Sequence, residues 1–226
     1  VYSKMGSLAL AHNGTLVNAQ ILRDEMQDDG YIFQTSIDTE IIAALIARHL
    51  RENTVEEAVS KACNTVKGAF ALVITTGEKL IGVRDPNGIR PLCLGKTASG
   101  YILSSESCVF PLQGATYVRD IKPGEMVVIE NNEITSIMYN ENAPRKVCSF
   151  EYVYFARTDS HMEDKSIYMT RREAGRILAR NDDVEADLVI AVPDSGTVAA
   201  IGYAEESGIP FGEGLVKNRY VGRTFI

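Results

Sequence analysis

The chain has 226 residues, and 23 lysines and arginines against 30 aspartates and glutamates give a formal net charge of −7, which argues against a protein that binds nucleic-acid phosphates. Hydrophobic residues make up 45% of the chain and charged residues 23%, which is enough for a packed core and excludes intrinsic disorder. The longest apolar runs, residues 41–47 and 69–74, fall far short of the roughly 20 residues of a membrane-spanning helix, so no membrane partner is expected.

The first part of the chain mixes helices and strands. An apolar run at residues 7–11 predicts a strand that ends in a turn at Asn13-Gly14. Apolar spacing and end signals predict three helices, and alternating or continuous apolar runs predict two hairpins. The helices are residues 16–27, 38–49 and 54–67, the last with Gly68 as terminator, and the hairpins pair 69–75 with 80–83 and 126–129 with 134–139.

The polar stretch at residues 140–146 predicts a domain boundary, so that residues 1–146 form an α+β domain and residues 147–226 begin another. After the boundary, residues 149–156 predict an aromatic-rich strand and residues 171–181 a helix. A strand at 188–192, a helix at 197–206 that stops at Gly208 and an extended segment at 209–211 predict a β-α-β unit, which is typical of an α/β domain.

Both ends of the chain indicate that the sequence is part of a longer protein. Residue 1 is Val rather than Met, no signal-peptide pattern follows it, and the chain stops on Phe225-Ile226 without a terminating signal. The four cysteines at 63, 93, 108 and 148 form no close pairs, which favours reduced thiols in a cytoplasmic protein. A disulfide framework remains an alternative, although a chain of this length does not need one.

Asn13-Gly14 is the first candidate site. The ordinary interpretation is a tight turn, because both residues tolerate positive φ. The alternative is an oxyanion hole, in which the Asn13 side-chain amide and the Gly14 N–H donate hydrogen bonds to the developing negative oxygen of an amide under attack.

Asp38 is the second candidate. An acid at the start of a helix commonly serves only the helix dipole. The alternative is a fixed carboxylate that binds the ammonium group of a substrate.

A third candidate is the loop Asp194-Ser195-Gly196 at the start of a predicted helix, where exposed N–H groups can hold an anionic oxygen group. Lys217, Arg219 and Arg223 follow it and place three cations within seven residues of an acidic chain. They form either a solvated surface loop or a phosphate-binding cluster, since the Arg guanidinium matches phosphate geometry.

Together these segments resemble the glutamine phosphoribosylpyrophosphate amidotransferases, or amidophosphoribosyltransferases, over almost the whole chain. The motifs that carry the resemblance are LAHNG at 10–14, SIDTE at 36–40, RDPNGIRPL at 84–92, FEYVYFAR at 150–157, VPDSG at 192–196 and KNRYVGRTF at 217–225. The first two are shared with other glutaminases that use an N-terminal cysteine nucleophile, whereas the later motifs select the acceptor of the ammonia.

The resemblance implies a fold of two parts. Residues 1–146 would be an N-terminal-nucleophile (Ntn) glutaminase domain with αββα layers, lacking its first segment, and residues 147–226 would begin a phosphoribosyltransferase domain. It also implies the activity: glutamine is hydrolysed in the first domain, and ammonia passes through a tunnel to phosphoribosylpyrophosphate in the second. The products are 5-phosphoribosylamine, glutamate and pyrophosphate, in the first committed step of purine biosynthesis.

The resemblance assigns roles to the candidate residues. Asn13 and Gly14 match oxyanion-hole positions, and Asp38 matches the acid that holds the glutamine amino group. Asp194, Ser195 and Gly196 match the loop that faces the pyrophosphate, with Ser195 as an Mg²⁺ ligand. Lys217, Arg219, Tyr220 and Arg223 match a loop that closes over phosphoribosylpyrophosphate and helps to form the tunnel.

Further partners follow from the same resemblance. Cys148 matches the first ligand of the structural [4Fe–4S] cluster that some members carry, the alternative being an ordinary buried thiol. Purine nucleotides are implied as feedback inhibitors and a homo-oligomer as the assembly. The family's nucleophilic cysteine would lie upstream of Val1, so the 226-residue polypeptide by itself is predicted to be inactive.

Two rival functions remain open. A glucosamine-6-phosphate synthase type of enzyme shares the Asn-Gly and Asp-Thr-Glu features, although the motif at 217–225 argues against it. The other rival is a non-catalytic fragment.

Overall fold

The computed structural model describes residues 2–3, 6–218 and 220–222. These fall into two units, Val1–Val147 and Cys148–Ile226, whose division lies beside the boundary expected between residues 146 and 147.

A five-stranded antiparallel sheet forms the centre of the first unit, in the order β10-β9-β5-β4-β3. Its strands are β3 (Ala9–Leu16), β4 (Gly68–Thr75), β5 (Lys79–Arg84), β9 (Glu125–Glu130) and β10 (Glu133–Met138). Both predicted hairpins are confirmed, because β4 pairs with β5 and β9 with β10. A short hairpin of β1 (Tyr2–Ser3) and β2 (Gly6–Ser7) precedes β3.

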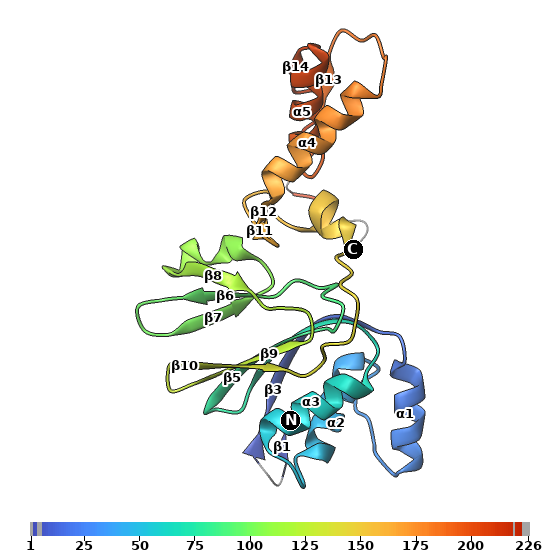
Figure 1. Ribbon diagram of the computed structural model, residues 1–226. Coiled ribbons are helices and arrows are strands. Elements are labelled where there is room, and N and C mark those ends of the chain that lie inside the picture. Colours follow the sequence, from blue (N-terminus) through green and yellow to red (C-terminus); the bar gives the residue numbers. More distant parts are fainter. Residues whose placement is uncertain (1, 4–5, 219, 223–226) are drawn as a thin grey trace. The chain divides into compact units, whose positions relative to one another are not determined.

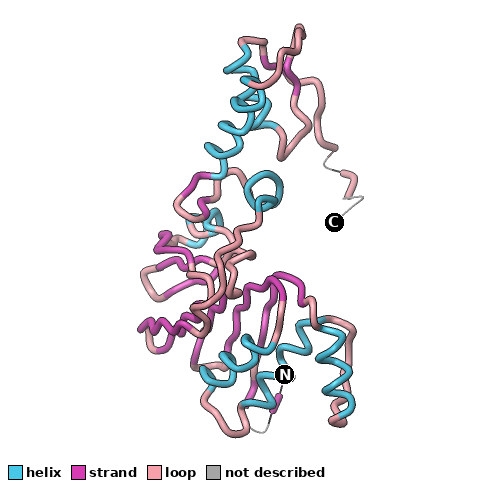
Figure 2. Tube along the Cα trace, turned by 45° about the vertical axis from the view of Figure 1, so that its right-hand side comes forward, coloured by secondary structure: helices cyan, strands magenta, loops and turns pink. Residues whose placement is uncertain are grey.

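Three helices cover one face of this sheet (Figures 1 and 2). They are α1 (Ala19–Asp28), α2 (Asp38–His49) and α3 (Val55–Thr65). The capping box predicted at Thr54 and Glu57 is present at the start of α3. The apolar faces of the helices and the inner side chains of β3, β4 and β5 form the main core, in which Ile41, Ile46 and Phe70 are fully buried. All three predicted helices are therefore confirmed, although α1 begins later than expected because Leu16 belongs to β3.

A second, three-stranded sheet packs on the other face, in the order β7-β6-β8. Its strands are β6 (Cys93–Lys96), β7 (Tyr101–Ser104) and β8 (Thr116–Asp120), none of which the sequence patterns predicted. Leu92 and Leu94 from this side share a core with Ala71 and Val127 of the large sheet. The far face of β6 is covered by the short 3-10 helices Ser107–Val109 and Pro111–Gln113. The helix layer and the two sheet layers of the expected arrangement are thus in place.

Two turn predictions in this unit are wrong. Asn13 and Gly14 lie inside β3 rather than in a turn, because the strand continues to Leu16 and stays paired with β4 along its whole length. Gly68 does not terminate α3, which ends at Thr65; it begins β4 instead, with φ at +137°. At both positions the conformational freedom of glycine serves a close approach between the two strands rather than a turn.

The second unit contains the predicted β-α-β unit. Strand β13 (Val189–Ile190) pairs in parallel with β14 (Phe211–Gly212), and α5 (Thr197–Ser207) connects them. Gly208 ends α5 in the left-handed conformation, with φ at +76°, as expected. The strand predicted at 149–156 is wrong, because residues Glu151–Phe155 form a π-helical turn. The buried Arg171 guanidinium donates hydrogen bonds to the Tyr152 carbonyl in this turn and to the Ala156 carbonyl directly after it.

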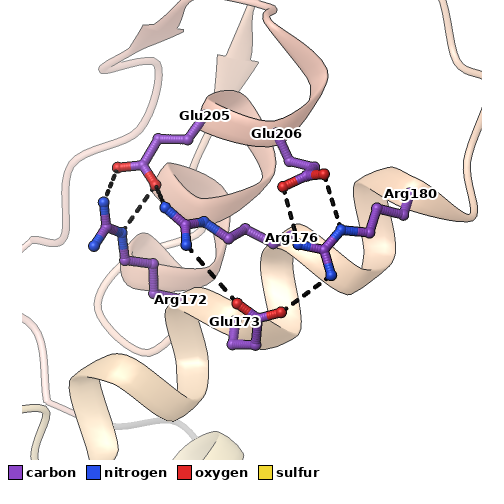
Figure 3. A network of polar contacts seen from close by, with 6 residues as sticks. All are labelled: Arg172, Glu173, Arg176, Arg180, Glu205 and Glu206. Atoms are coloured by element: carbon purple, nitrogen blue, oxygen red, sulfur yellow. Dashed lines mark hydrogen bonds and ion pairs between the residues drawn. The ribbon is translucent and has the colours of Figure 1, made fainter.

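Helix α4 (Ile167–Arg180) packs closely against α5, because each helix presents a glycine to the backbone of the other. A Cβ at Gly175 would lie 1.9 Å from the Ala199 carbonyl oxygen, and one at Gly202 would lie 2.0 Å from that of Arg172. Figure 3 shows the polar edge of this contact, where arginines of α4 meet acids of α5. Arg172 and Arg176 pair with Glu205, and Arg180 pairs with Glu206. A short hairpin of β11 (His161–Met162) and β12 (Lys165–Ser166) precedes α4.

Among the helices that the structure describes, none is long and apolar enough to cross a membrane.

Glu125 joins the two sheets of the first unit. Its side chain is 1% exposed and accepts two hydrogen bonds of 2.8 Å from the Arg119 guanidinium of β8. It also accepts hydrogen bonds from the Lys122 N–H and from the Ser136 hydroxyl of β10. We expect Glu125→Ala to lower the free energy of unfolding by about 2 kcal/mol, because it removes the buried acceptor of the hydrogen bonds from Arg119, Lys122 and Ser136. Urea denaturation measures the loss, and the exposed Glu133→Ala on β10 should change stability by less than about 0.5 kcal/mol.

The hydrogen bonds of Glu125 also predict that the stability of the fold depends on pH. Burial alone raises the pKa of Glu125, but the hydrogen bonds from Arg119, Ser136 and Lys122 outweigh it and leave the pKa below its ordinary value. A carboxyl with a depressed pKa stabilises the fold above the unfolded-state pKa of about 4.3, and the stabilisation is lost as the pH falls through the folded-state value. The stability difference between wild type and Glu125→Ala should therefore narrow below about pH 4. A difference that stays constant between pH 7 and pH 3 would contradict this account.

Candidate functional site

The Asn13-Gly14 pair occupies a constrained place on β3. Asn13 lies opposite Ala71 of β4, which in turn lies opposite Arg84 of β5. Gly14 has φ at +145°, and a Cβ there would lie 1.9 Å from the Ala69 carbonyl oxygen. A side chain at residue 14 would therefore push the two strands apart. Asn13 itself is exposed, so its side-chain amide is accessible.

Asp38 is attached to the same strand. It begins α2, and its Oδ2 accepts a hydrogen bond of 3.0 Å from the Leu16 N–H of β3. Its side chain is still 25% exposed, which leaves room for a cationic group. The interpretation of Asp38 as only a helix-start acid is therefore incomplete, because one of its oxygens connects the helix to the strand that carries Asn13 and Gly14.

His12 lies between these elements. Its side chain is 2% exposed, with Nδ1 3.2 Å from Thr39 Oγ1 and 3.5 Å from Asp38 Oδ1. Burial lowers the pKa of His12 below its ordinary value, with a contribution in the same direction from Arg90, while the Asp38 carboxylate opposes the shift. His12 belongs to the LAHNG motif at residues 10–14, but the sequence alone assigned it no role. Alternation along β3, which places His12 on the helix face and Asn13 on the other, is the signal that could have separated them.

The segment before Asp38 is held from both sides. The Glu40 carboxylate accepts hydrogen bonds from the N–H groups of Gln34 and Thr35. The Arg23 guanidinium of α1 donates to the carbonyls of Thr35 and Ile37 and stacks over the Phe33 ring at 4.2 Å. These contacts fix the entry to α2 and so the position of Asp38.

The loop at residues 85–90 is built around two buried charges. The Asp85 carboxylate accepts hydrogen bonds from the N–H groups of Asn87, Ile89 and Arg90. The Arg84 guanidinium donates to the carbonyls of Gly88, Arg90 and Ile121. The Asp85 N–H donates to the carbonyl of Phe70, the residue opposite Gly14. The loop is thus attached to β4 beside the Asn13-Gly14 pair, a role that sequence reasoning missed.

Four candidates of the second unit, Asp194, Ser195, Gly196 and Lys217, lie at the loop that begins α5. Lys217 Nζ lies 2.9 Å from Asp194 Oδ2, so the structure brings together the loop and one of the predicted cations. A Cβ at Gly196 would lie 2.7 Å from the Val192 carbonyl oxygen, which explains a glycine at this tight turn. Ser195 lies between them and is partly exposed, and Tyr220 is fully exposed. Arg219 and Arg223 lie outside the described residues.

The family resemblance implies two metal groups, an Mg²⁺ at Ser195 and a [4Fe–4S] cluster at Cys148, among the residues that the structure describes. No group of three or more His, Cys, Asp or Glu side chains in this part of the chain is arranged to hold a metal ion. Ser195 and Asp194 supply hard oxygen donors, which suit an Mg²⁺ that arrives already bound to a diphosphate and needs only one or two protein ligands. Cys148 is the only cysteine in residues 148–226 and so does not form a cluster site with other cysteines of its own unit.

The chain is similar to known proteins over nearly its whole length. Residues 1–111 match the glutamine amidotransferase domain family. The amidophosphoribosyltransferase of Archaeoglobus fulgidus is 46% identical over 100% of this chain and 50% of its own, and that of Bacillus subtilis is 48% identical over 98% of this chain and 46% of its own. The solved glutamine phosphoribosylpyrophosphate amidotransferase of B. subtilis, complexed with ADP and GMP, superposes with a TM-score of 0.94 at 47% identity, covering 99% of this chain and 49% of that one.

Residues 1–111 are thus similar to the glutamine amidotransferase domain family, and the first unit has the Ntn-type fold of the matching domain in the solved B. subtilis enzyme. Across both units, the chain is homologous to the amidophosphoribosyltransferases. It spans about half the length of the curated relatives that it matches.

The contact of Gly14 with β4 predicts a large cost for a side chain at this position. We expect Gly14→Ala to destabilise the protein by more than about 2 kcal/mol, because the strained φ and the overlap with the Ala69 carbonyl add together. Gly77→Ala is the matched control, since Gly77 also has a positive φ, at +93°, but has open space around its Cβ position. It should cost only about 1 kcal/mol in thermal or urea denaturation. Equal losses for the two variants would show that the close approach to β4 does not matter.

Proposed function

We propose that the protein carrying this chain is a glutamine-dependent amidophosphoribosyltransferase. In this reaction glutamine, water and phosphoribosylpyrophosphate give glutamate, 5-phosphoribosylamine and pyrophosphate, the first committed step of purine biosynthesis. The observation that carries the proposal is that the similarity to amidophosphoribosyltransferases continues through both units, well beyond the glutamine amidotransferase match at residues 1–111. The similarity of the first unit supports glutamine as the source of the ammonia, and the similarity of the second unit supports phosphoribosylpyrophosphate as its acceptor.

The glutamine half-reaction uses the groups held by β3 and α2. Asp38 presents one side of its carboxylate to the substrate ammonium group, while its Oδ2 is held by the Leu16 N–H. Amide groups alternate in direction along a strand, so the Gly14 N–H points to the same outer edge of β3 as the Leu16 N–H. There it can donate, together with the Asn13 side chain, to the oxygen that becomes negative during attack on the glutamine amide.

The thiol nucleophile of this reaction is proposed to come from outside residues 1–226. Burial raises the pKa of Cys63 to about 12 and also raises the pKa of Cys93, so neither carries a thiolate at neutral pH. Cys108 lies beside the Glu106 carboxylate, and Cys148 belongs to the other unit. An upstream cysteine, at the position that the family resemblance implies, fits better than any of the four.

The acceptor half-reaction is proposed for the loop that begins α5. The Gly196 and Thr197 N–H groups donate to the Val192 and Asp194 carbonyls. The pyrophosphate of phosphoribosylpyrophosphate would therefore bind through the other N–H groups at the start of α5, since the N-terminus of a helix favours anionic oxygens. Ser195 and Asp194 would contact an Mg²⁺ bound to that pyrophosphate, which neutralises the charge of the leaving group. Lys217, Arg219, Tyr220 and Arg223 remain our candidates for the closing loop and the ammonia tunnel.

Four further assignments rest mainly on the relatives. The B. subtilis structure contains ADP and GMP, and we propose that purine nucleotides regulate this protein as well. A homo-oligomer and a cytoplasmic location are proposed from the family resemblance and the unpaired thiols. Cys148 stays a predicted ligand of a [4Fe–4S] cluster, and no catalytic step is assigned to such a cluster.

The proposal is tested with the full-length protein supplied with glutamine and one acceptor at a time. Phosphoribosylpyrophosphate should give glutamate and pyrophosphate in equal amounts. Glutamate formation that depends on fructose 6-phosphate instead would support the glucosamine-6-phosphate synthase type of function, and no turnover with either acceptor would support a non-catalytic role.

Asn13→Ala tests the oxyanion hole. In the full-length protein we expect the kcat for glutamine hydrolysis to fall by about 10²- to 10³-fold, because a donor to the developing oxyanion is removed. Formation of phosphoribosylamine from added ammonia should be unchanged, since that route does not need the first unit. Steady-state assays of both routes measure the difference, and an equal loss in both would indicate misfolding rather than a lost donor.

A further inference from the structure

We propose that His12 is a positioning residue for Asp38 and thereby sets the affinity of the glutaminase site for glutamine. The inference rests on the proposed function, because it assigns Asp38 to the substrate ammonium group.

The geometry places His12 where it can act only through the start of α2. His12 lies opposite Leu72, a fully buried core residue, and therefore on the helix face of the large sheet. Its Nδ1 lies within 3.5 Å of both Asp38 Oδ1 and Thr39 Oγ1. The two oxygens of the Asp38 carboxylate thus face two neighbouring groups of β3, His12 and the Leu16 N–H.

The other ring nitrogen makes no such contact. Within the part of the chain that the structure describes, the buried His12 Nε2 has no hydrogen-bond partner. A histidine that serves only to fill a core normally satisfies both nitrogens. All the polar contacts of His12 among these residues are instead directed to the first turn of α2.

A neutral imidazole suits this role. Burial and Arg90 lower the pKa of His12, so the ring is uncharged at pH 7 although it faces a carboxylate. Since the Asp38 carboxylate can only accept, the hydrogen of the neutral ring belongs on Nδ1. An uncharged donor orients the carboxylate without neutralising it, and the full negative charge remains for the substrate ammonium group.

Three variants separate positioning from packing. His12→Leu fills the space but removes the donor. His12→Asn places an amide nitrogen near the position of Nδ1 and so can restore the contact with Asp38 or Thr39. Leu10→Ala is the matched control, because Leu10 packs against the same core from the same face of β3.

The experiment is steady-state glutamine hydrolysis by the full-length protein, with ammonia-dependent formation of phosphoribosylamine as the check on folding. We expect His12→Leu to raise the KM for glutamine about tenfold with kcat changed less than about threefold, since binding common to ground and transition states is lost. His12→Asn should recover most of the lost affinity. Leu10→Ala should lower the melting temperature and leave the KM for glutamine unchanged.

An unchanged KM in His12→Leu, in an enzyme whose wild type hydrolyses glutamine, would overturn this inference and leave the proposed function intact. A wild type without glutamine hydrolysis would overturn the proposed function and this role with it. If His12→Leu does not fold, two results decide: the KM of His12→Asn and the histidine ¹⁵N spectrum of the wild type at pH 7. The proposal would be contradicted if the KM for glutamine of His12→Asn were no lower than that of the other His12 variants that fold. It would also be contradicted if the spectrum showed an imidazolium or an Nε2–H tautomer for His12.

Discussion

The hydrogen bond from the Leu16 N–H to Asp38 Oδ2 connects the parts of the candidate glutaminase site. Leu16 is the last residue of β3, the edge strand of the large sheet, and Asp38 is the first residue of α2. An edge strand leaves half of its N–H groups without strand partners, and here one of them is used to hold a helix at a set distance from the sheet. The candidate oxyanion donors and the candidate ammonium-binding carboxylate are thereby held at fixed positions relative to one another.

The surroundings of this hydrogen bond reinforce it. Gly14 lets β3 and β4 approach closely just before Leu16, and the loop at residues 85–90 is anchored to β4 on the other side. Glu40 and Arg23 hold the segment that leads into α2. Each of these side chains makes its hydrogen bonds mainly to backbone groups, which orients loops without depending on flexible side-chain pairs.

The elements with strong local signals could be predicted from the sequence. Apolar spacing and the capping box identified α2 and α3, and continuous apolar runs between turn residues identified the two hairpins and the β-α-β unit. The small sheet was missed because its strands are short and contain polar residues and Gly95. Residues 149–156 were predicted as a strand from their aromatic content, but tertiary contacts with Arg171 stabilise a helical turn instead.

The candidate site, like the fold, could be predicted only in part. Asn13, Gly14 and Asp38 could be named because local motifs and a family resemblance pointed to them. The turn expected at Asn13-Gly14 was wrong, because the positive φ of Gly14 serves contact with a strand that is distant in sequence. His12 and Asp85 were missed for a related reason: their partners, Thr39 and the Phe70 carbonyl among them, are joined only when the sheet forms.

Asp38→Asn is the most direct test of this account, because the amide oxygen can still accept from the Leu16 N–H while the charge is removed. For the full-length protein we predict that the KM for glutamine rises about 10- to 100-fold, as expected for a lost charged hydrogen bond, and that thermal stability changes little. An unchanged KM for glutamine would contradict the assignment of Asp38 to the substrate ammonium group and, with it, the central claim about this site.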